Sequence, residues 1–379
     1  MYLEAFSSAK DPALKQRNED RICTGPGGYF AVIDGVTDKS GRPLPDGSSR
    51  GQEAGRLIER TLYDLATEGS LFDVPLALLL ERLEINFQNR YRELGELAEA
   101  SETPNLRFGA QLALAVPGTA GTDGTSGTAG IGGTEAGSRA WRLVVVGDCG
   151  IRIDGDRTLG TPQVAESVLA AWRAMVVKQA LANGAAVQRA LDCGRHYCLA
   201  GTAGFEPKWE AELSRPEFES LRSTARRELL GLTRGLPSGT LDEILSAGVL
   251  GAARYRNTAG ELGQACIDGF TVPPEKVVEE VVAENASEAA SFELFSDGYF
   301  GTPPAGATTV TDWEAHIAKV EREDPYKIGA YPATKGSSKD KFTDDRTVVI
   351  VKPRPRLSGV RYTSELPGIT PTGGTDVAE

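Results

Sequence analysis

Short apolar runs that end at an acidic residue recur along this chain. In the sharpest example, the residues Phe-Ala-Val-Ile at 30–33 lead directly into Asp34 and Gly35. A run of this length bounded by turn-forming residues is typical of a buried strand. The same arrangement ends at two further acids, Asp148 and Asp297. Each of these acids either forms a turn or binds a ligand, and most Asp-Gly pairs in proteins are plain turns.

The spacing of apolar residues predicts strands in short groups, separated by groups of helices. Strands are expected over 2–9, 20–34, 106–116, 141–153, 262–272, 291–296 and 346–351, the first two as a hairpin that turns at 25–28. Helical spacing is found over 51–67, 73–100, 163–192, 275–283 and about 311–323, and residues 206–250 are mostly helical. Because the strands do not alternate regularly with helices, the pattern predicts an α+β fold of antiparallel sheets with helices outside them.

Two segments differ in composition from the rest. Residues 117–140 are almost wholly Gly, Thr, Ala and Ser, and residues 353–379 are rich in Pro, Gly and Thr. Such segments bury too little apolar surface to offset the entropy of ordering them. The first is therefore expected to be a flexible loop between two strands, and the second a disordered tail that follows a domain over 1–352.

The composition narrows the class of protein. The 379 residues include 41 basic and 53 acidic side chains, a net charge of −12, without basic runs. This balance argues against nucleic acid or an anionic membrane as the main partner. The N-terminus lacks the basic and apolar regions of a signal peptide, and no apolar run is long enough to cross a bilayer. Five cysteines without a CxxC pair indicate reduced thiols and a cytoplasmic location.

The acidic residues next to the predicted strands are the candidate functional residues. They are Glu19, Asp20, Asp34, Asp148, Asp297, Asp344 and Asp345. If the sheets bring these ends together, the carboxylates repel one another, and cations relieve the repulsion. Oxygen ligands without sulfur or imidazole favour Mg²⁺ or Mn²⁺ over zinc. Two such ions can hold a water, lower its pKa and direct it at a phosphorus atom.

Other chemistries find little support in the sequence. With only His196 and His316 available and no GxSxG motif, a Ser/His/Asp triad has few possible bases. The chain also has no Gly-Lys pair and hence no P-loop.

The order of five separated motifs resembles the metal-dependent protein phosphatase family of the 2C type, in a form similar to its bacterial members. The motifs are Asn18-Glu19-Asp20, Phe30-Ala-Val-Ile-Asp34-Gly35, Val146-Gly147-Asp148, Leu294-Phe-Ser-Asp297-Gly298 and Asp344-Asp345-Arg346-Thr347. The resemblance spans residues 1–352. It implies a β-sandwich flanked by helices on both sides, in four αββα layers, with a two-metal centre that hydrolyses phosphoserine and phosphothreonine.

The resemblance also implies roles for individual residues. Asp34 would bridge two Mn²⁺ or Mg²⁺ ions, and the carbonyl of Gly35 would bind the second ion. The remaining implied ligands are Glu19 and Asp20 through metal-bound water, Asp297 and Asp344 at the first ion, and Asp148 with Asp297 at a weaker third site.

The chain departs from the family pattern at several positions. Val36 replaces the His of eukaryotic members, so protonation of the leaving group would come from metal-bound water. Lys15 stands where the family has a phosphate-binding Arg, and Arg17 offers a bidentate fork two residues before Glu19. Phosphate binding is therefore expected at Arg17 or Lys15. Residues 163–260, longer than the usual variable flap, would influence substrate choice.

Three functions remain open at this point. The first is a phosphoserine/phosphothreonine protein phosphatase, whose partner would be a phosphorylated protein. The second is a binding or regulatory module on the same fold with weak catalysis, and the third is a phosphatase of small phosphorylated metabolites. The presence of every expected carboxylate favours an enzyme over a module, whereas neither the oligomeric state nor the substrate follows from the sequence.

Overall fold

The computed structural model describes residues 1–37, 41–42, 44–69, 71–119, 139–283, 291–336 and 341–352. Most of the predicted loop over 117–140 and the whole predicted tail over 353–379 lie outside the described residues.

The described strands form two five-stranded antiparallel sheets. The order in the first sheet is β1 (Tyr2–Ser8), β10 (Arg346–Lys352), β9 (Phe292–Phe295), β6 (Gly150–Ile153) and β7 (Arg157–Leu159). The order in the second sheet is β2 (Arg21–Thr24), β3 (Phe30–Gly35), β4 (Ala110–Thr119), β5 (Arg139–Val146) and β8 (Val277–Ala283).

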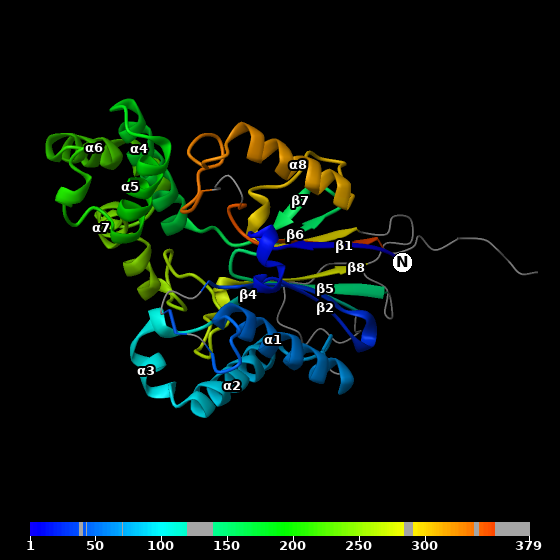
Figure 1. Cartoon of the computed structure of the whole chain (residues 1–379). Coiled ribbons are helices and arrows are strands. Elements are labelled where there is room, and N and C mark those ends of the chain that lie inside the picture. The colour runs from blue at the N-terminus through cyan, green and yellow to red at the C-terminus, as the bar shows by residue number, and fades with distance from the viewer. Residues whose placement is uncertain are drawn as a thin grey trace, which may run out of the picture.

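Helices cover both outer faces of this pair of sheets (Figure 1). The second sheet packs against α1 (Arg50–Thr67) and α2 (Leu76–Leu94), which is followed by the short α3 (Leu97–Glu102). The first sheet packs against α8 (Val310–Glu323). The predicted α+β sandwich in four αββα layers is therefore confirmed. None of the helices in the described part of the chain combines the length and hydrophobicity that crossing a bilayer would require.

The position of β3 between the other sheet and the helices explains why residues 30–33 are all apolar. Successive side chains of a strand point to opposite faces. Phe30 and Val32 join the core between the sheets, whereas Ala31 and Ile33 join the core beneath the helices. Because both faces of the strand are covered, no polar residue interrupts the run until Asp34, where the strand reaches the end of the sandwich.

A separate helical group lies beyond one end of the sandwich (Figure 1). It comprises α4 (Val164–Ala182), α5 (Val187–Ala200), α6 (Arg215–Glu228) and α7 (Thr240–Ala252). These helices pack around their own core, which includes Trp172, Tyr197 and Phe218. The helix predicted over 163–192 is thus two helices, because the chain turns at Gly184 with φ of +85°.

The structure corrects several predicted elements. Residues 275–283, expected to be helical, form mainly the strand β8, where β-branched valines pair with β5 at the edge of the sheet. Residues 262–272, expected to be a strand, contribute two isolated bridges, between Ala110 and Ile267 and between Arg256 and Gln264. The helix over 73–100 ends at Gly95, whose left-handed backbone separates α2 from α3.

The predicted opening hairpin is also wrong in its pairing. The strand β2 does pair with β3 across the turn at Pro26–Gly28, as expected from the glycines there. The first strand, however, pairs in the other sheet with β10, so that Tyr2 lies opposite Lys352. Strands from the two ends of the described chain therefore lie side by side, which brings residues 344–345 next to residues 10–20.

Candidate metal centre

The acids that follow the buried strands meet at one end of the sandwich. Asp34 is the last but one residue of β3, Asp148 follows β5 and Asp297 follows β9. Asp20 joins them from the start of β2, where its Oδ2 accepts a hydrogen bond of 2.7 Å from the hydroxyl of Ser296. Because β3 and β5 both pair antiparallel with β4, they run in the same direction and end at the same end of the sheet. The strand β2, which is antiparallel to β3, begins at that end.

Burial and mutual repulsion change the proton affinity of this cluster. Burial, followed by the charges of Asp20 and Asp297, raises the pKa of Asp34 well above its usual value. Burial raises the pKa of Asp20 to about 8 and that of Asp297 to about 7, and neighbouring carboxylates add to both effects. The pKa of Asp148 is raised in the same way by burial and by Asp297. Like charges held this closely favour any cation that can enter.

The pKa of Asp344 is lowered, in contrast to those of the other acids, because two lysines lie beside it. Burial alone would raise its pKa, but the charges of Lys335 and Lys10 outweigh this effect and lower it. The ammonium of Lys335 donates a hydrogen bond to Oδ2 of Asp344, and Nζ of Lys10 lies 3.5 Å from Oδ1. Neither lysine was predicted from the sequence, because neither belongs to a family motif.

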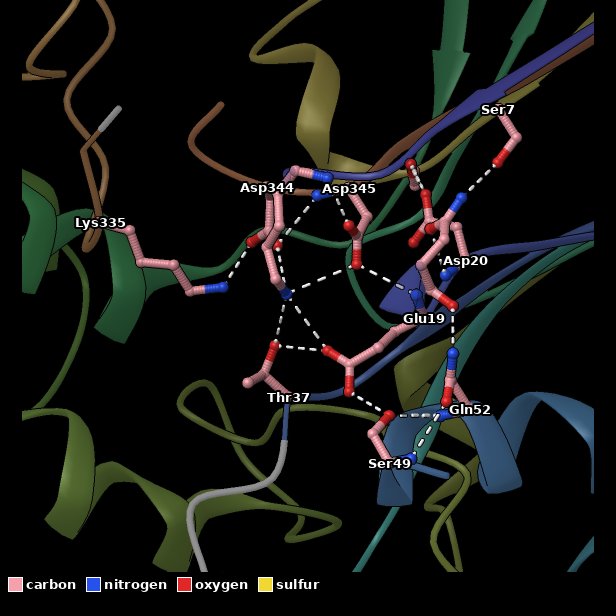
Figure 2. A network of polar contacts seen from close by, with 12 residues as sticks. Ser7, Glu19, Asp20, Thr37, Ser49, Gln52, Lys335, Asp344 and Asp345 are labelled. Carbon is pink, nitrogen blue, oxygen red and sulfur yellow. Dashed lines mark hydrogen bonds and ion pairs between the residues drawn. The ribbon is translucent and has the colours of Figure 1, made fainter. Parts of the chain in front are cut away.

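Glu19 lies almost fully buried beside the cluster, surrounded by donors (Figure 2). Its carboxylate accepts hydrogen bonds of 2.7 Å from Ser49 Oγ, 2.8 Å from Thr37 Oγ1 and 3.2 Å from Lys10 Nζ. Ser49 is also the N-cap of α1, in a capping box with Gln52. The start of α1 is thereby tied to the candidate centre.

Asp345 holds the segments around Glu19 in place. Its Oδ2 accepts a hydrogen bond of 3.1 Å from the backbone N–H of Glu19, and its Oδ1 accepts one of 2.6 Å from that of Lys10. The backbone N–H of Asp345 in turn donates to Oδ1 of Asp344 at 3.1 Å. Asp345 is therefore a positioning residue, a role that the sequence did not reveal.

Glycines allow the backbone to approach closely at two of the motifs. A Cβ atom at Gly35 would lie 2.6 Å from the carbonyl oxygen of Gly51 and 2.8 Å from that of Glu19. Gly147 has a φ of +85°, and a Cβ there would lie 2.2 Å from the side chain of Gln111. Both positions require glycine, because a side chain would displace the backbone that carries the neighbouring acid.

The residues present fit divalent cations. Ligand atoms of Asp34, Asp148 and Cys149 lie within 4.8 Å of one another. Among the described residues, Oδ1 of Asp20 and Oδ1 of Asp148 are buried without a hydrogen-bond partner. Buried polar atoms normally have partners, so unpaired oxygens amid like charges indicate room for a ligand that the protein itself does not supply. Carboxylate oxygens match the preference of Mg²⁺ and Mn²⁺.

The two cations predicted to bind phosphate belong to the turn that precedes Glu19. Lys15 and Arg17 are exposed at the end of the 3₁₀ turn Pro12–Arg17. The charge of Arg17 acts on Asp11, which is the N-cap of that turn. Within the described residues, the cations that form ion pairs with Glu19, Asp344 and Asp345 are Lys10 and Lys335.

Comparison with known proteins identifies resemblances among solved structures alone. No protein-family model and no curated protein matches this chain. The serine/threonine phosphatase PstP/Ppp of Mycobacterium tuberculosis matches at 13% identity with a TM-score of 0.38, over 93% of this chain and 99% of its own. The catalytic domain of PstP in complex with two manganese ions matches at 13% identity with a TM-score of 0.37, over 92% of this chain and 97% of its own. The phosphatase Stp1 of Staphylococcus aureus matches at 10% identity with a TM-score of 0.39, over 93% of this chain and 95% of its own.

At these identities and TM-scores, the function of this chain has to be argued from its own residues.

Proposed function

We propose that this chain is a metal-dependent phosphatase of the 2C type that hydrolyses phosphoserine and phosphothreonine in a protein partner. The observation that carries the proposal is the convergence of Asp20, Asp34, Asp148 and Asp297 at one end of the sandwich, with unpaired buried oxygens among them. The motif order of the sequence supports the reaction and the substrate class.

The protein side chains have distinct roles in this proposal. Asp34 would bridge two ions, and the carbonyl of Gly35 would bind the second of them. Asp297 and Asp344 would complete the shell of the first. Asp148 and Asp297 would hold a weaker third ion. When bound, Mn²⁺ or Mg²⁺ supplies a water of lowered pKa and positive charge beside the phosphoryl group.

The remaining groups orient the site. Glu19 and Asp20 would orient metal-bound water, since Ser49, Thr37 and Ser296 fix their carboxylates by hydrogen bonds. Val36 in place of a histidine leaves the protonation of the leaving group to water. The sandwich over residues 1–352 would then be one catalytic domain, and the helical group would influence which substrate enters.

A cytoplasmic location forms part of the proposal. The five cysteines are all buried, and none of them forms a disulfide. Cysteines without disulfides are typical of proteins in a reducing compartment.

Hydrolysis of p-nitrophenyl phosphate tests the proposal. The wild type should turn over this substrate only with Mn²⁺ or Mg²⁺, and Asp34→Ala should reduce the rate by at least about a hundredfold. Asp46→Asn is the matched control, because Asp46 begins another Asp-Gly pair but is exposed and pairs with Arg56. It should retain the wild-type rate.

Two results would contradict the assignment. If the purified protein shows no metal-dependent turnover, or if Asp34→Ala is as active as the wild type, the chain is a binding module and not an enzyme. A panel of phosphopeptides against phosphorylated metabolites then separates the two substrate classes, with faster hydrolysis of the peptides expected.

A further inference from the structure

Lys335 is the most exposed of the described cations that contact the carboxylate cluster. Its side chain is 50% exposed, whereas that of its partner Asp344 is 17% exposed. Figure 2 shows the ammonium reaching towards Asp344 from the side opposite to Asp20. An ammonium group has three N–H donors, and within the described chain the structure shows one hydrogen bond for it, to Asp344. The lysine therefore combines a position at the cluster with access from solvent.

The segment that carries Lys335 is held rigidly by a buried arginine from the helical group. Arg173 of α4 is 2% exposed, and its Nη1 donates to the carbonyl oxygens of Tyr326, Lys327 and Ala333, each at 3.1 Å. The residue after Lys335 packs on the same guanidinium, since a Cβ atom at Gly336 would lie 2.5 Å from Nη2 of Arg173. Arg173 thus contacts the chain before Lys335, at Ala333, and directly after it, at Gly336.

A second anchor holds the start of the same segment. The carboxylate of Asp324, which is buried, accepts hydrogen bonds from the backbone N–H groups of Ile328, Gly329 and Tyr331 at 2.7 to 3.0 Å. The ammonium of Lys327 is fully buried and pairs with Glu321 at 2.8 Å. These contacts restrict the segment that precedes Lys335, which reduces the entropy lost when its ammonium binds a ligand.

Lys10 differs from Lys335 in its surroundings. Its ammonium lies between Glu19 at 3.2 Å, Asp345 at 3.4 Å and Asp344 at 3.5 Å, and it also donates to Thr37. These acceptors surround the ammonium and leave little of it for a substrate. Lys10 therefore serves as an internal counter-charge.

We propose that Lys335 binds a phosphoryl oxygen of the phosphate monoester, in place of the cations Arg17 and Lys15 suggested by sequence. The inference rests on the proposed function, because it concerns the substrate of the same site. A lysine ammonium binds phosphate as a point charge and does not require the planar fork of an arginine. Its position beside Asp344 places this charge next to the acids that would hold the ions.

Binding of inorganic phosphate tests the role of Lys335 without relying on turnover. Titration calorimetry with phosphate is carried out at a Mn²⁺ concentration that saturates each variant, after the Mn²⁺ affinity of that variant has been measured separately. Lys335→Met should bind phosphate about 10- to 100-fold more weakly than the wild type, the usual value of a charge-assisted hydrogen bond. Lys335→Arg should recover most of the affinity, because it restores the charge.

Lys341→Met is the matched control. Lys341 is 57% exposed and pairs with Asp11 at 2.8 Å, so it resembles Lys335 in exposure and in having one carboxylate partner. This variant should bind phosphate like the wild type. Circular dichroism should show the same folded content in all three variants, since both lysines are exposed.

Two results would overturn the inference. The first is an unchanged phosphate affinity in Lys335→Met. The second is an altered Mn²⁺ affinity without any change in phosphate affinity, which would make Lys335 a counter-charge of Asp344 alone. If the wild type binds phosphate through Lys335 but hydrolyses no monoester, the proposed function fails while the phosphate site stands.

Discussion

At the scale of single residues, the candidate centre is a set of carboxylates held close together by the rest of the fold. Asp20, Asp34 and Asp297 have pKa values raised by burial and by one another. In the absence of a cation, their ionised forms therefore destabilise the folded state relative to the unfolded chain, in which they are separated and solvated. The metal-free protein is thus expected to become less stable as these carboxylates ionise.

The metal-free protein should lose stability as pH rises. An Asp in the unfolded chain has a pKa of about 4. Below that pH, the stabilisation of the folded state by proton binding to these carboxylates is fully present. It is lost as pH rises through the folded pKa values, which are about 8 for Asp20 and about 7 for Asp297. The melting temperature in EDTA should therefore fall by roughly 5 °C or more between pH 5.5 and pH 8.5.

Differential scanning calorimetry checks this dependence with two comparisons. Asp34→Asn should melt higher than the wild type at pH 8 in EDTA, because it removes one buried charge from the cluster. Excess Mn²⁺ should make stability rise with pH in the wild type, since metal binding requires deprotonated ligands. A wild type that is more stable in EDTA at pH 8.5 than at pH 5.5 would contradict the assigned repulsion.

At the scale of elements, the first sheet contains a buried ion pair between neighbouring strands. Arg152 of β6 lies opposite Glu293 of β9, and its Nε donates to Oε2 at 3.0 Å. The indole N–H of Trp313 in α8 donates to the same oxygen at 2.6 Å. Because Glu293 is fully buried, these donors join the two strands to the helix that covers them.

Removal of Glu293 should destabilise the protein strongly. Glu293→Ala leaves the guanidinium of Arg152 buried without its carboxylate, and breaking such a pair costs about 3–5 kcal/mol. Glu280→Ala is the control, because Glu280 pairs with Arg157 at a partly exposed position and its loss should cost less than about 1 kcal/mol. Urea unfolding at pH 7 measures both values, and an equal loss in the two variants would refute the role given to the buried pair.

At the scale of the whole molecule, Arg173 connects the helical group to the sandwich. It belongs to α4, and its guanidinium donates to three carbonyl oxygens of the segment 324–336 that carries Lys335. Burial lowers the pKa of Arg173, although it stays cationic at any physiological pH. Through this contact, a change in the helical group can alter the position of a cation at the candidate centre.

Arg173→Met should loosen that segment. The substitution keeps an apolar stem but leaves three carbonyl oxygens without their donor, at an expected cost of about 3 kcal/mol in unfolding free energy. Hydrogen–deuterium exchange should increase over 324–336 while β9 and β10 remain protected. Unchanged exchange over 324–336 would show that Arg173 does not hold the segment.

The strands, the helices and the positions of the acids could largely be predicted from the sequence, because each is specified by residues that are neighbours in the chain. A run of apolar residues that ends in an acid predicts both the strand and the position of the acid, as at Asp34, Asp148 and Asp297. The period of apolar residues likewise predicted α1 and α8 within a residue or so. Local signals failed where they were ambiguous, as at Val277–Ala283, whose valines suit an edge strand as well as they suit a short amphipathic helix.

The tertiary structure decided what depends on distant contacts. It paired β1 with β10, which set Asp345 against Lys10 and Glu19. It also brought Lys335 to the acids, whereas Lys15 and Arg17, closer in sequence to Glu19, remain exposed. The physical reason is that a strand and its terminal acid are specified by neighbouring residues, whereas the partners of that acid depend on which chain segments the sheets and helices bring together.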